Sequence, residues 1–298
     1  MKPVYITEMP GMQLLERRGM FDIYGAQDGR HLYVATDRFY LRGRPSALPF
    51  PGKGIWFTQI AIYTFSRLHH FLNSIFQPDK QALPDELRRF RPLLHQRVIM
   101  ARPAQPIPVR CNVLATVGDT AWEEFKRDGA IAGIPVPGDI RKGHALPFPI
   151  FAPKILKNGE EPRSYSTFVE LKESVGPDVA QFLQDKSIET FIFAAKMLEP
   201  KNIVLHSASF EFGFSGDQII MTSYPLTPDN TVLTMRKAAG TDPVESRLDE
   251  GLVELLLERE PEKPDPRLPL VLPQDVIHRM CYTYELYCNI LTKDERRR

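Results

Sequence analysis

Apolar and polar residues change their spacing several times along the chain, and each spacing predicts a type of element. The apolar and β-branched run His31–Ala35 follows a turn signal at Gln27-Asp28-Gly29, so we expect a hairpin with residues 20–24 as its other arm. A loop rich in proline and glycine, residues 42–54, follows it. Apolar residues then recur at helical spacing over residues 55–76 and predict a helix that stops before Pro78.

The middle of the chain alternates short apolar runs with proline. Residues 98–100 and 109–115 are typical of strands, and the prolines between them keep them apart. Residues 84–96 form a basic helix or loop, and a short helix is expected over 122–128, ending at Gly129. Residues 133–163, rich in glycine and proline, are too long for a simple connection.

The second half favours helices mixed with strands. A helix over 167–175 has Ser166 or Thr167 as its N-cap, and a longer one covers Pro177–Leu198. Further elements are strands at 203–205, 209–214 and 218–222 (the last two joined by a turn at 215–217), a helix at 248–257, a proline-rich spacer at 261–273 and a helix at 273–292. This order predicts an α+β fold, with a β-rich N-terminal lobe over residues 1–100 and a larger C-terminal lobe over 101–298.

Composition excludes several classes of function. The 298 residues include 38 basic and 37 acidic side chains, so the net charge of +1 gives no general attraction to nucleic acid or to an anionic membrane. No apolar run reaches the roughly 20 residues of a membrane helix, and residues 1–16 lack the pattern of a secretory signal. Cys111, Cys281 and Cys288 fit neither a disulfide framework nor a zinc site, so we expect a cytoplasmic protein.

Several short motifs stand in a fixed order from the first hairpin to the last helix. They are Thr36-Asp37-Arg38, Pro51-Gly52-Lys53-Gly54, Thr58-Gln59, Pro108-Val109 with Cys111, Trp122-Glu123-Glu124-Phe125, Pro149-Ile150-Phe151, Phe210-Glu211-Phe212-Gly213 and Leu226-Thr227-Pro228-Asp229. In sequence and order they resemble motifs of the SAICAR synthetase family. The resemblance implies that family's fold, with a cleft between its two lobes. It also implies ATP and Mg²⁺ as cofactors, in a reaction that joins aspartate to a phosphoribosyl-imidazole carboxylate.

The chain departs from the family pattern where the family carries charge. The hairpin before Asp22 has no lysine. Gly43 stands where the family has an aspartate, and Leu114 and Val232 stand where it has arginines. The list of changed positions also includes Ser207 and Ser209 for Asp and Lys, Ser223-Tyr224 for a metal-holding Asp-Glu pair, and Asp119-Thr120-Ala121 for Gly-Ser-Gly. Because phosphoryl transfer depends on positioning and charge stabilisation, these losses predict weak or no standard activity.

The remaining polar positions are the candidates for a site. By the resemblance, Arg17, Arg18 and Lys53 are nucleotide-binding, Arg38, Thr120 and Asp229 are substrate-binding, and Glu211 is a metal ligand. Each has a structural alternative. The glycines around Lys53 fit a tight turn, and Arg38 can form an ion pair with Asp37. Thr120 can serve as a helix N-cap, and Glu211 can be a solvent-facing residue of a strand. The basic residues Arg88, Arg89, Arg91, Arg97 and Arg102 either bind an acidic partner or form a solvated helix face.

Two functions from different classes follow. In the first, the chain is a divergent paralogue that binds a nucleotide or another anionic small molecule, or pairs with itself or another protein subunit. A cleft packed with Met20, Phe21, Leu114 and Tyr224 would favour it. In the second, the chain is an active amide ligase of the family, or one rebuilt for another anionic substrate with Arg17, Arg18, Arg102 or Arg110. An open cleft lined by arginines would favour the rebuilt ligase.

Overall fold

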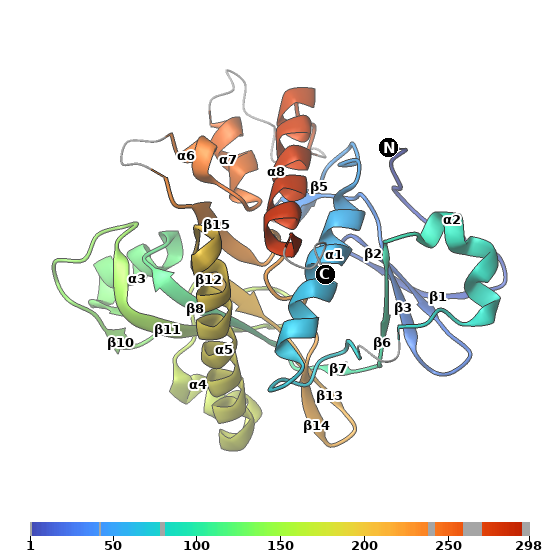
Figure 1. Ribbon diagram of the computed structural model, residues 1–298. Helices are drawn as coiled ribbons and strands as arrows, with labels where there is room; N and C mark the ends of the chain where they lie inside the picture. The colour runs from blue at the N-terminus through green and yellow to red at the C-terminus, as the bar shows by residue number, and fades with distance from the viewer. Residues whose placement is uncertain (1, 42, 78–80, 238–241, 259–269, 294–298) are drawn as a thin grey trace.

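The computed structural model describes residues 2–41, 43–77, 81–237, 242–258 and 270–293. Two four-stranded antiparallel sheets form its two sides, and helices α1, α5 and α8 pack between and against them (Figure 1). The first sheet has the order β1-β2-β3-β6 and contains only N-terminal strands. The predicted α+β fold, with a sheet-rich N-terminal region, is confirmed.

The predicted N-terminal hairpin is confirmed with its register. Strands β2 (Phe21–Gly25) and β3 (His31–Ala35) pair antiparallel, with Phe21 opposite Ala35 and Gly25 opposite His31. Strand β6 (Val98–Ala101) pairs with β3. Strand β1 (Gln13–Arg18) forms the edge of the sheet and was not predicted, because all six of its residues are exposed and its sequence does not alternate.

Helix α1 (Lys53–Leu68) is shorter than the predicted helix over 55–76. After Leu68 the chain turns into an extended segment, in which Ser74 and Phe76 form isolated bridges with Met221 and Ala101. The apolar residues of this segment pack against both sheet and helices, since Ile75 and Phe76 join a cluster with Ile99 of β6, and Phe71 contacts Phe193 of α5. Burial, not helical geometry, therefore accounts for the apolar spacing beyond Leu68.

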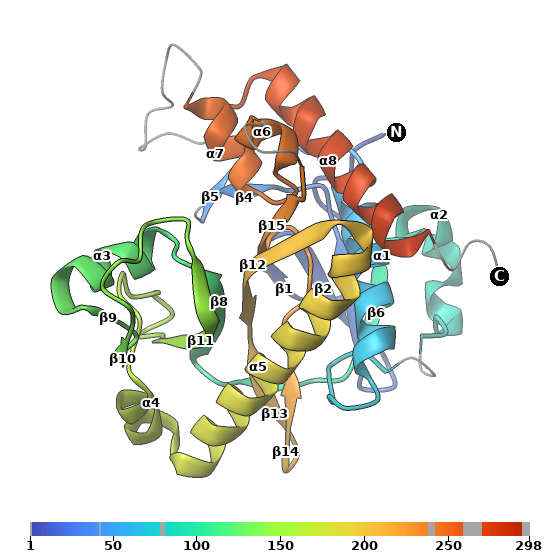
Figure 2. The same ribbon diagram turned by 60° about the vertical axis from the view of Figure 1, so that its left-hand side comes forward.

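The second sheet has the order β11-β8-β12-β15, and helix α5 (Pro177–Leu198) crosses it (Figure 2). Its strands are β8 (Val109–Thr116), β11 (Ala145–Ile155), β12 (Ile203–Phe210) and β15 (Thr231–Met235). The segment 133–163 thus contains the long strand β11. Strand β12 runs unbroken through the gap expected between residues 205 and 209, and ends at Phe210, directly before Glu211.

Smaller strands complete the sheets. A three-stranded sheet, β14-β13-β7, contains the predicted hairpin, whose turn has Gly216 at a positive φ of 59°. Its strands are β7 (Gln105–Pro106), β13 (Phe212–Ser215) and β14 (Gln218–Met221), and the two-stranded pairs are β4 (Tyr40–Leu41) with β5 (Arg44–Pro45) and β9 (Ala130–Ile131) with β10 (Ile134–Pro135).

The remaining helices connect these sheets. Helix α4 (Phe168–Val175) starts at the predicted N-cap Thr167, which forms a capping box with Glu170. Helix α3 (Asp119–Asp128) ends at Gly129 as predicted, but its N-cap is Gly118, so the N-cap reading of Thr120 is wrong. The others are η2 (Asp85–Phe90), α2 (Arg91–Leu94), η3 (Glu199–Lys201), α6 (Pro243–Ser246), α7 (Gly251–Leu257) and α8 (Gln274–Thr292). Most of the predicted spacer over 261–273 lies outside the described residues.

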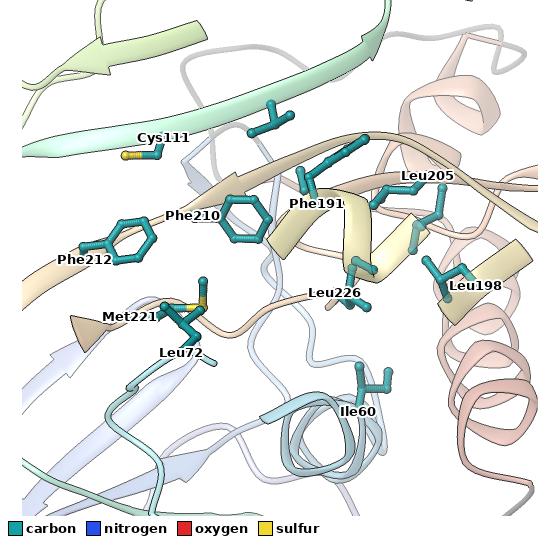
Figure 3. Packing of buried hydrophobic residues seen from close by; sticks show 14 of the residues in the cluster. Ile60, Leu72, Cys111, Phe191, Leu198, Leu205, Phe210, Phe212, Met221 and Leu226 are labelled. Atoms are coloured by element: carbon teal, nitrogen blue, oxygen red, sulfur yellow. The ribbon is translucent and has the colours of Figure 1, made fainter. Parts of the chain in front are cut away.

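The largest hydrophobic core lies between α5, the second sheet and α1. Phe191 of α5 faces Phe210 of β12, and Leu198 of α5 and Ile60 of α1 belong to the same cluster (Figure 3). Tyr287 of α8 is fully buried in it as well. The N-terminal helix therefore shares its core with the C-terminal half, and the division at residue 100 stays a prediction. None of the helices in the described ranges is long and apolar enough to cross a membrane.

Candidate functional site

A cavity of about 620 Å³ opens between the first sheet and the strands that follow Phe210. It lies where the β1–β2 turn, the start of α1 and the end of β12 meet. Its polar lining consists of Arg18, Tyr40, Lys53, Arg110, Glu161, Glu211, Thr222, Ser223, Asp229, Asn230 and Glu250. The structure thus brings four of the predicted site residues together, namely Arg18, Lys53, Glu211 and Asp229.

Lys53, at the start of α1, has its charge engaged inside the protein. Only 1% of the residue is exposed, and its Nζ lies 2.8 Å from Oδ1 of Asp229 and 3.2 Å from the sulfur of Met20. The rings of Phe39, Phe57 and Tyr284 surround the ammonium group at 5.4 to 5.8 Å. A ligand phosphate would have to compete with the partly buried carboxylate of Asp229 for this lysine.

Glu211 also has an internal partner. It follows β12 directly, and its Oε1 lies 3.2 Å from Nη2 of Arg110 on the neighbouring strand β8. The same guanidinium pairs with Glu161 at 2.8 Å, and Glu161 pairs with Lys154 at 3.0 Å. The predicted metal ligand is therefore one end of a chain of four alternating charges.

Aromatic side chains fill the wall of the cavity beside the first sheet. Tyr224 is buried and stacks on Phe21, with 4.7 Å between ring centroids and 21° between ring planes. Phe57 and Tyr33 meet Tyr224 edge-on. Burial holds the pKa of the Tyr224 phenol well above its ordinary value, and its hydroxyl has no hydrogen-bond partner. Tyr224 therefore acts as an apolar wall where the family pattern has a carboxylate.

Three predicted ligand residues, Arg38, Arg17 and Thr120, lie outside this cavity. Arg38 is 6% exposed and donates to Asp22 Oδ1 at 2.7 Å and to three backbone carbonyls, those of Gly19, Tyr5 and Phe21. The expected ion pair between Arg38 and Asp37 does not form, because Asp37 pairs with Arg97 instead. Arg38 thus organises the β1–β2 turn.

Arg17 points away from the cavity. It lies 3.6 Å from the carboxylate of Asp22 and donates to the carbonyl of Thr7. Neighbouring residues on a strand face opposite sides, so Arg18 lines the cavity while Arg17 cannot. Arg102 also lies elsewhere and donates to the carbonyl of Ser74.

Thr120 belongs to a second cavity, of about 630 Å³, on the far side of Arg110. Leu114, Thr116, Asp119, Thr120, Lys154, Arg163, Tyr165, Ser207 and Val232 line it. Leu114 is buried there, where the family pattern has an arginine. Glu161 touches both cavities through its two cationic partners, Arg110 in the first and Lys154 in the second.

A second carboxyl group stands beside the Lys53–Asp229 pair. Glu250 lines the first cavity, and burial together with the neighbouring charge of Asp229 holds the pKa of its carboxyl well above the ordinary value. Behind it, burial also raises the pKa of Asp249, whose carboxylate accepts from Leu233 N and Gly251 N and pairs with Arg247. The lysine thus balances one carboxylate, and the second carboxyl favours its neutral form.

These donors do not form a magnesium centre by themselves. Mg²⁺ binds through one or two carboxylates and completes its octahedral shell with water and ligand phosphates. Glu211 already accepts from Arg110, and Ser223-Tyr224 supply no carboxylate. In the part of the chain that the structure describes, no group of three or more His, Cys, Asp or Glu side chains could hold a metal ion.

Two residues of the site were not singled out from the sequence. Glu250 and Lys154 each lie beside the charges of the site, yet neither stands in a motif with a polar pattern of its own. Arg110 was noted from the sequence, but nothing in the spacing of 51 residues between Arg110 and Glu161 indicates that they pair. Only the pairing of β8 with β11 brings these side chains together.

Comparison with known proteins assigns the family. The family profile described as SAICAR synthetase matches residues 18–255. The phosphoribosylaminoimidazole-succinocarboxamide synthase of Desulfosudis oleivorans is 27% identical over 280 residues, which cover 92% of this chain and 93% of the relative. That of Syntrophobacter fumaroxidans is 29% identical over 274 residues, covering 91% and 90%. The solved SAICAR synthase of Saccharomyces cerevisiae, complexed with SAICAR, has a TM-score of 0.80 at 23% identity and covers 97% of this chain and 98% of its own. The motif order, the fold and the profile agree, and the chain belongs to the SAICAR synthetase family.

Proposed function

We propose that this chain is a divergent member of its family that binds an anionic small molecule in the cleft and has weak or no standard SAICAR synthetase activity. The family reaction uses ATP to activate a carboxylate, and its transition state requires cations on the phosphates and carboxylates on the metal. Both kinds of charge must be free to meet the ligand.

The single observation that carries the proposal is the internal pairing of the charges that still match the family. Lys53 is committed to Asp229, and Glu211 to Arg110. Releasing Lys53 would leave the Asp229 charge in a largely buried setting, which is costly. The Tyr224–Phe21 stack adds an apolar wall that has no affinity for a metal-bound phosphate.

The anion-binding part of the proposal rests on Arg18 and Arg110. Both line the first cavity, and their side chains are 56% and 38% exposed, so ligands can reach them. Guanidinium groups bind carboxylates and phosphates through two parallel hydrogen bonds. The same observation favours a second candidate function, a related ligase that acts on another anionic substrate.

Thermal unfolding in the presence of ligands tests the proposal. A ligand that binds only the folded state raises the melting temperature by mass action. We expect ATP and other phosphate compounds at millimolar concentration to raise it by a similar amount with and without Mg²⁺. In a standard SAICAR synthetase assay we expect a rate several decades below that of a family enzyme measured in parallel.

The matched control is Arg18→Gln, which removes an exposed cation of the cavity, beside Arg88→Gln, which removes an exposed cation elsewhere. Only Arg18→Gln should reduce the shift. A shift that needs Mg²⁺, together with SAICAR formation at the family rate, would overturn the proposal. Ligation of a different carboxylate would decide for the second candidate.

A further inference from the structure

The two cavities are separated by one carboxylate. Glu161 follows a tight turn at residues 157–160, in which Lys157 and Glu160 exchange backbone hydrogen bonds. Its Oε2 lies 2.8 Å from Nη1 of Arg110, which lines the first cavity, and its Oε1 lies 3.0 Å from Nζ of Lys154, which lines the second. Each carboxylate oxygen is thus assigned to a different cation.

This arrangement has the form of an occupied anion site. Lys154 is fixed in place, since its side chain is 12% exposed and its ammonium lies 5.4 Å above the ring of Tyr165. Arg110 is fixed by Glu211 on its other side. Two cations held by separate contacts, with one carboxylate between them, present the donors that a planar carboxylate or a phosphate oxygen pair requires.

We propose that Glu161 is a specificity-determining residue that occupies an oxyanion site between Arg110 and Lys154, so that only a ligand whose own carboxylate or phosphate displaces it can span both cavities. This inference rests on the proposed anion-binding function. Displacement is feasible because the Glu161 side chain is 36% exposed, so its carboxylate can turn into the solvent, where water solvates the charge.

The second cavity suits such a ligand on its other walls. Thr120 and Ser207 supply hydroxyl groups, and Arg163 adds a further cation. The carboxylate of Asp119, which the sequence suggests would repel an anion, is paired with Lys142. The repulsion is therefore largely balanced, and Glu161 is left as the negative charge that competes directly with the ligand.

Isothermal titration calorimetry with inorganic phosphate on the full chain tests the inference. Glu161→Gln keeps the shape of the side chain and removes its charge. Partly exposed ion pairs hold a side chain only modestly, so we expect phosphate to bind about three- to thirtyfold more tightly to this variant than to the unmodified chain. Glu160→Gln is the matched control, since it removes the same charge at the adjacent exposed position.

A double variant identifies the cation. Arg110→Gln in the Glu161→Gln background should abolish the gain, whereas Arg88→Gln in the same background, which removes an equal charge at an exposed position elsewhere, should leave it in place. Melting temperatures of all variants verify that they are folded. Equal phosphate affinity of Glu161→Gln and the unmodified chain overturns the inference and leaves the proposed function standing, as does an equal gain in Glu160→Gln. Absence of phosphate binding in every variant overturns both.

Discussion

Individual residues in the cleft match the family motifs in side-chain type, but their charges are paired inside the protein. Lys53 and Glu211 are the side chains that the family motifs predict, but each is neutralised by a neighbour at hydrogen-bonding distance. Tyr224 is the reverse case, a polar side chain whose buried hydroxyl has no hydrogen-bond partner among the described residues. The consequences of both situations can be measured one residue at a time.

Two buried tyrosines allow a matched comparison of hydroxyl groups. Tyr287 donates to the carbonyl of Leu226 at 3.0 Å, whereas the Tyr224 hydroxyl has no partner. We expect Tyr287→Phe to lower the free energy of unfolding by about 0.5–1.5 kcal/mol, because it removes a buried hydrogen bond. Tyr224→Phe should leave it unchanged or raise it by up to about 1 kcal/mol. Urea unfolding of both variants measures the difference, and an equal loss in both would contradict the unpartnered state of Tyr224.

The raised pKa of Glu250 predicts a pH dependence of stability. The folded state binds this proton more tightly than the unfolded chain, whose carboxyl has an ordinary pKa of 4.5. The free energy of unfolding therefore falls as the pH rises above that value, until the folded carboxyl also ionises. The glutamine of Glu250→Gln cannot ionise. The melting temperature of this variant, relative to that of the unmodified chain, should therefore increase as the pH rises from 5 to about 8.

Differential scanning fluorimetry across this pH range measures the gain. Glu173→Gln is the control, because Glu173 is exposed on α4 and away from the cavity. A difference between Glu250→Gln and the unmodified chain that is constant with pH would show that Glu250 ionises alike in the folded and unfolded states.

At the scale of elements, helix α1 is positioned by a close backbone contact. Gly52 caps it with a φ of 89°, and Gly54 follows in its first turn. A Cβ at Gly54 would overlap the carbonyl oxygen of Ala35 on β3 and the guanidinium of Arg97. Gly54 therefore serves the close approach of α1 to the first sheet, a role beyond the tight turn that was the structural alternative drawn from the sequence.

The predicted result of Gly54→Ala is a loss of about 1–3 kcal/mol of unfolding free energy, since backbone atoms cannot make room as a flexible side chain would. Gly138→Ala is the matched control, because nothing lies within 4 Å of a Cβ there and its φ is not positive. It should leave stability within about 0.5 kcal/mol. Chemical denaturation distinguishes the two, and equal stability of both variants would contradict the close contact.

Across the whole molecule, the two halves share one core. Ile60 of α1, Phe191 of α5, Phe210 of β12 and Tyr287 of α8 are all buried in the same cluster. The first cavity lies on this junction, with walls from both halves. A shared core of this kind couples the folding of the lobes, even though the sheets are separate.

Calorimetry should therefore show one cooperative transition for the full chain, with equal calorimetric and van't Hoff enthalpies. The lobes cannot separate without exposing the cluster around Ile60 and Tyr287 to water. Two resolved transitions, or a calorimetric enthalpy well above the van't Hoff value, would instead support independent lobes divided near residue 100.

The sequence by itself determined the family, the hairpin at Phe21–Gly25 and His31–Ala35, the helix Pro177–Leu198 and a helix N-cap at Ser166 or Thr167, of which the structure has Thr167. These features depend on the spacing of apolar residues, on turn residues and on helix caps, all of which are set by residues close together in the chain. The extent of helix α1 was overestimated because the extended residues after Leu68 are also buried, and their apolar spacing matches that of a helix.

Only the tertiary structure decided the state of the site. Asp37 and Arg38 are neighbours in the chain but do not pair with each other. Arg38 pairs with Asp22, 16 residues away, and Asp37 pairs with Arg97, 60 residues away. Lys53, Glu211 and Glu161 likewise found partners on other elements. A charge interacts with whatever lies within a few ångströms of it, and strand pairing and helix packing set those distances. The sequence names the charged groups, and the fold decides which of them remain available to a ligand.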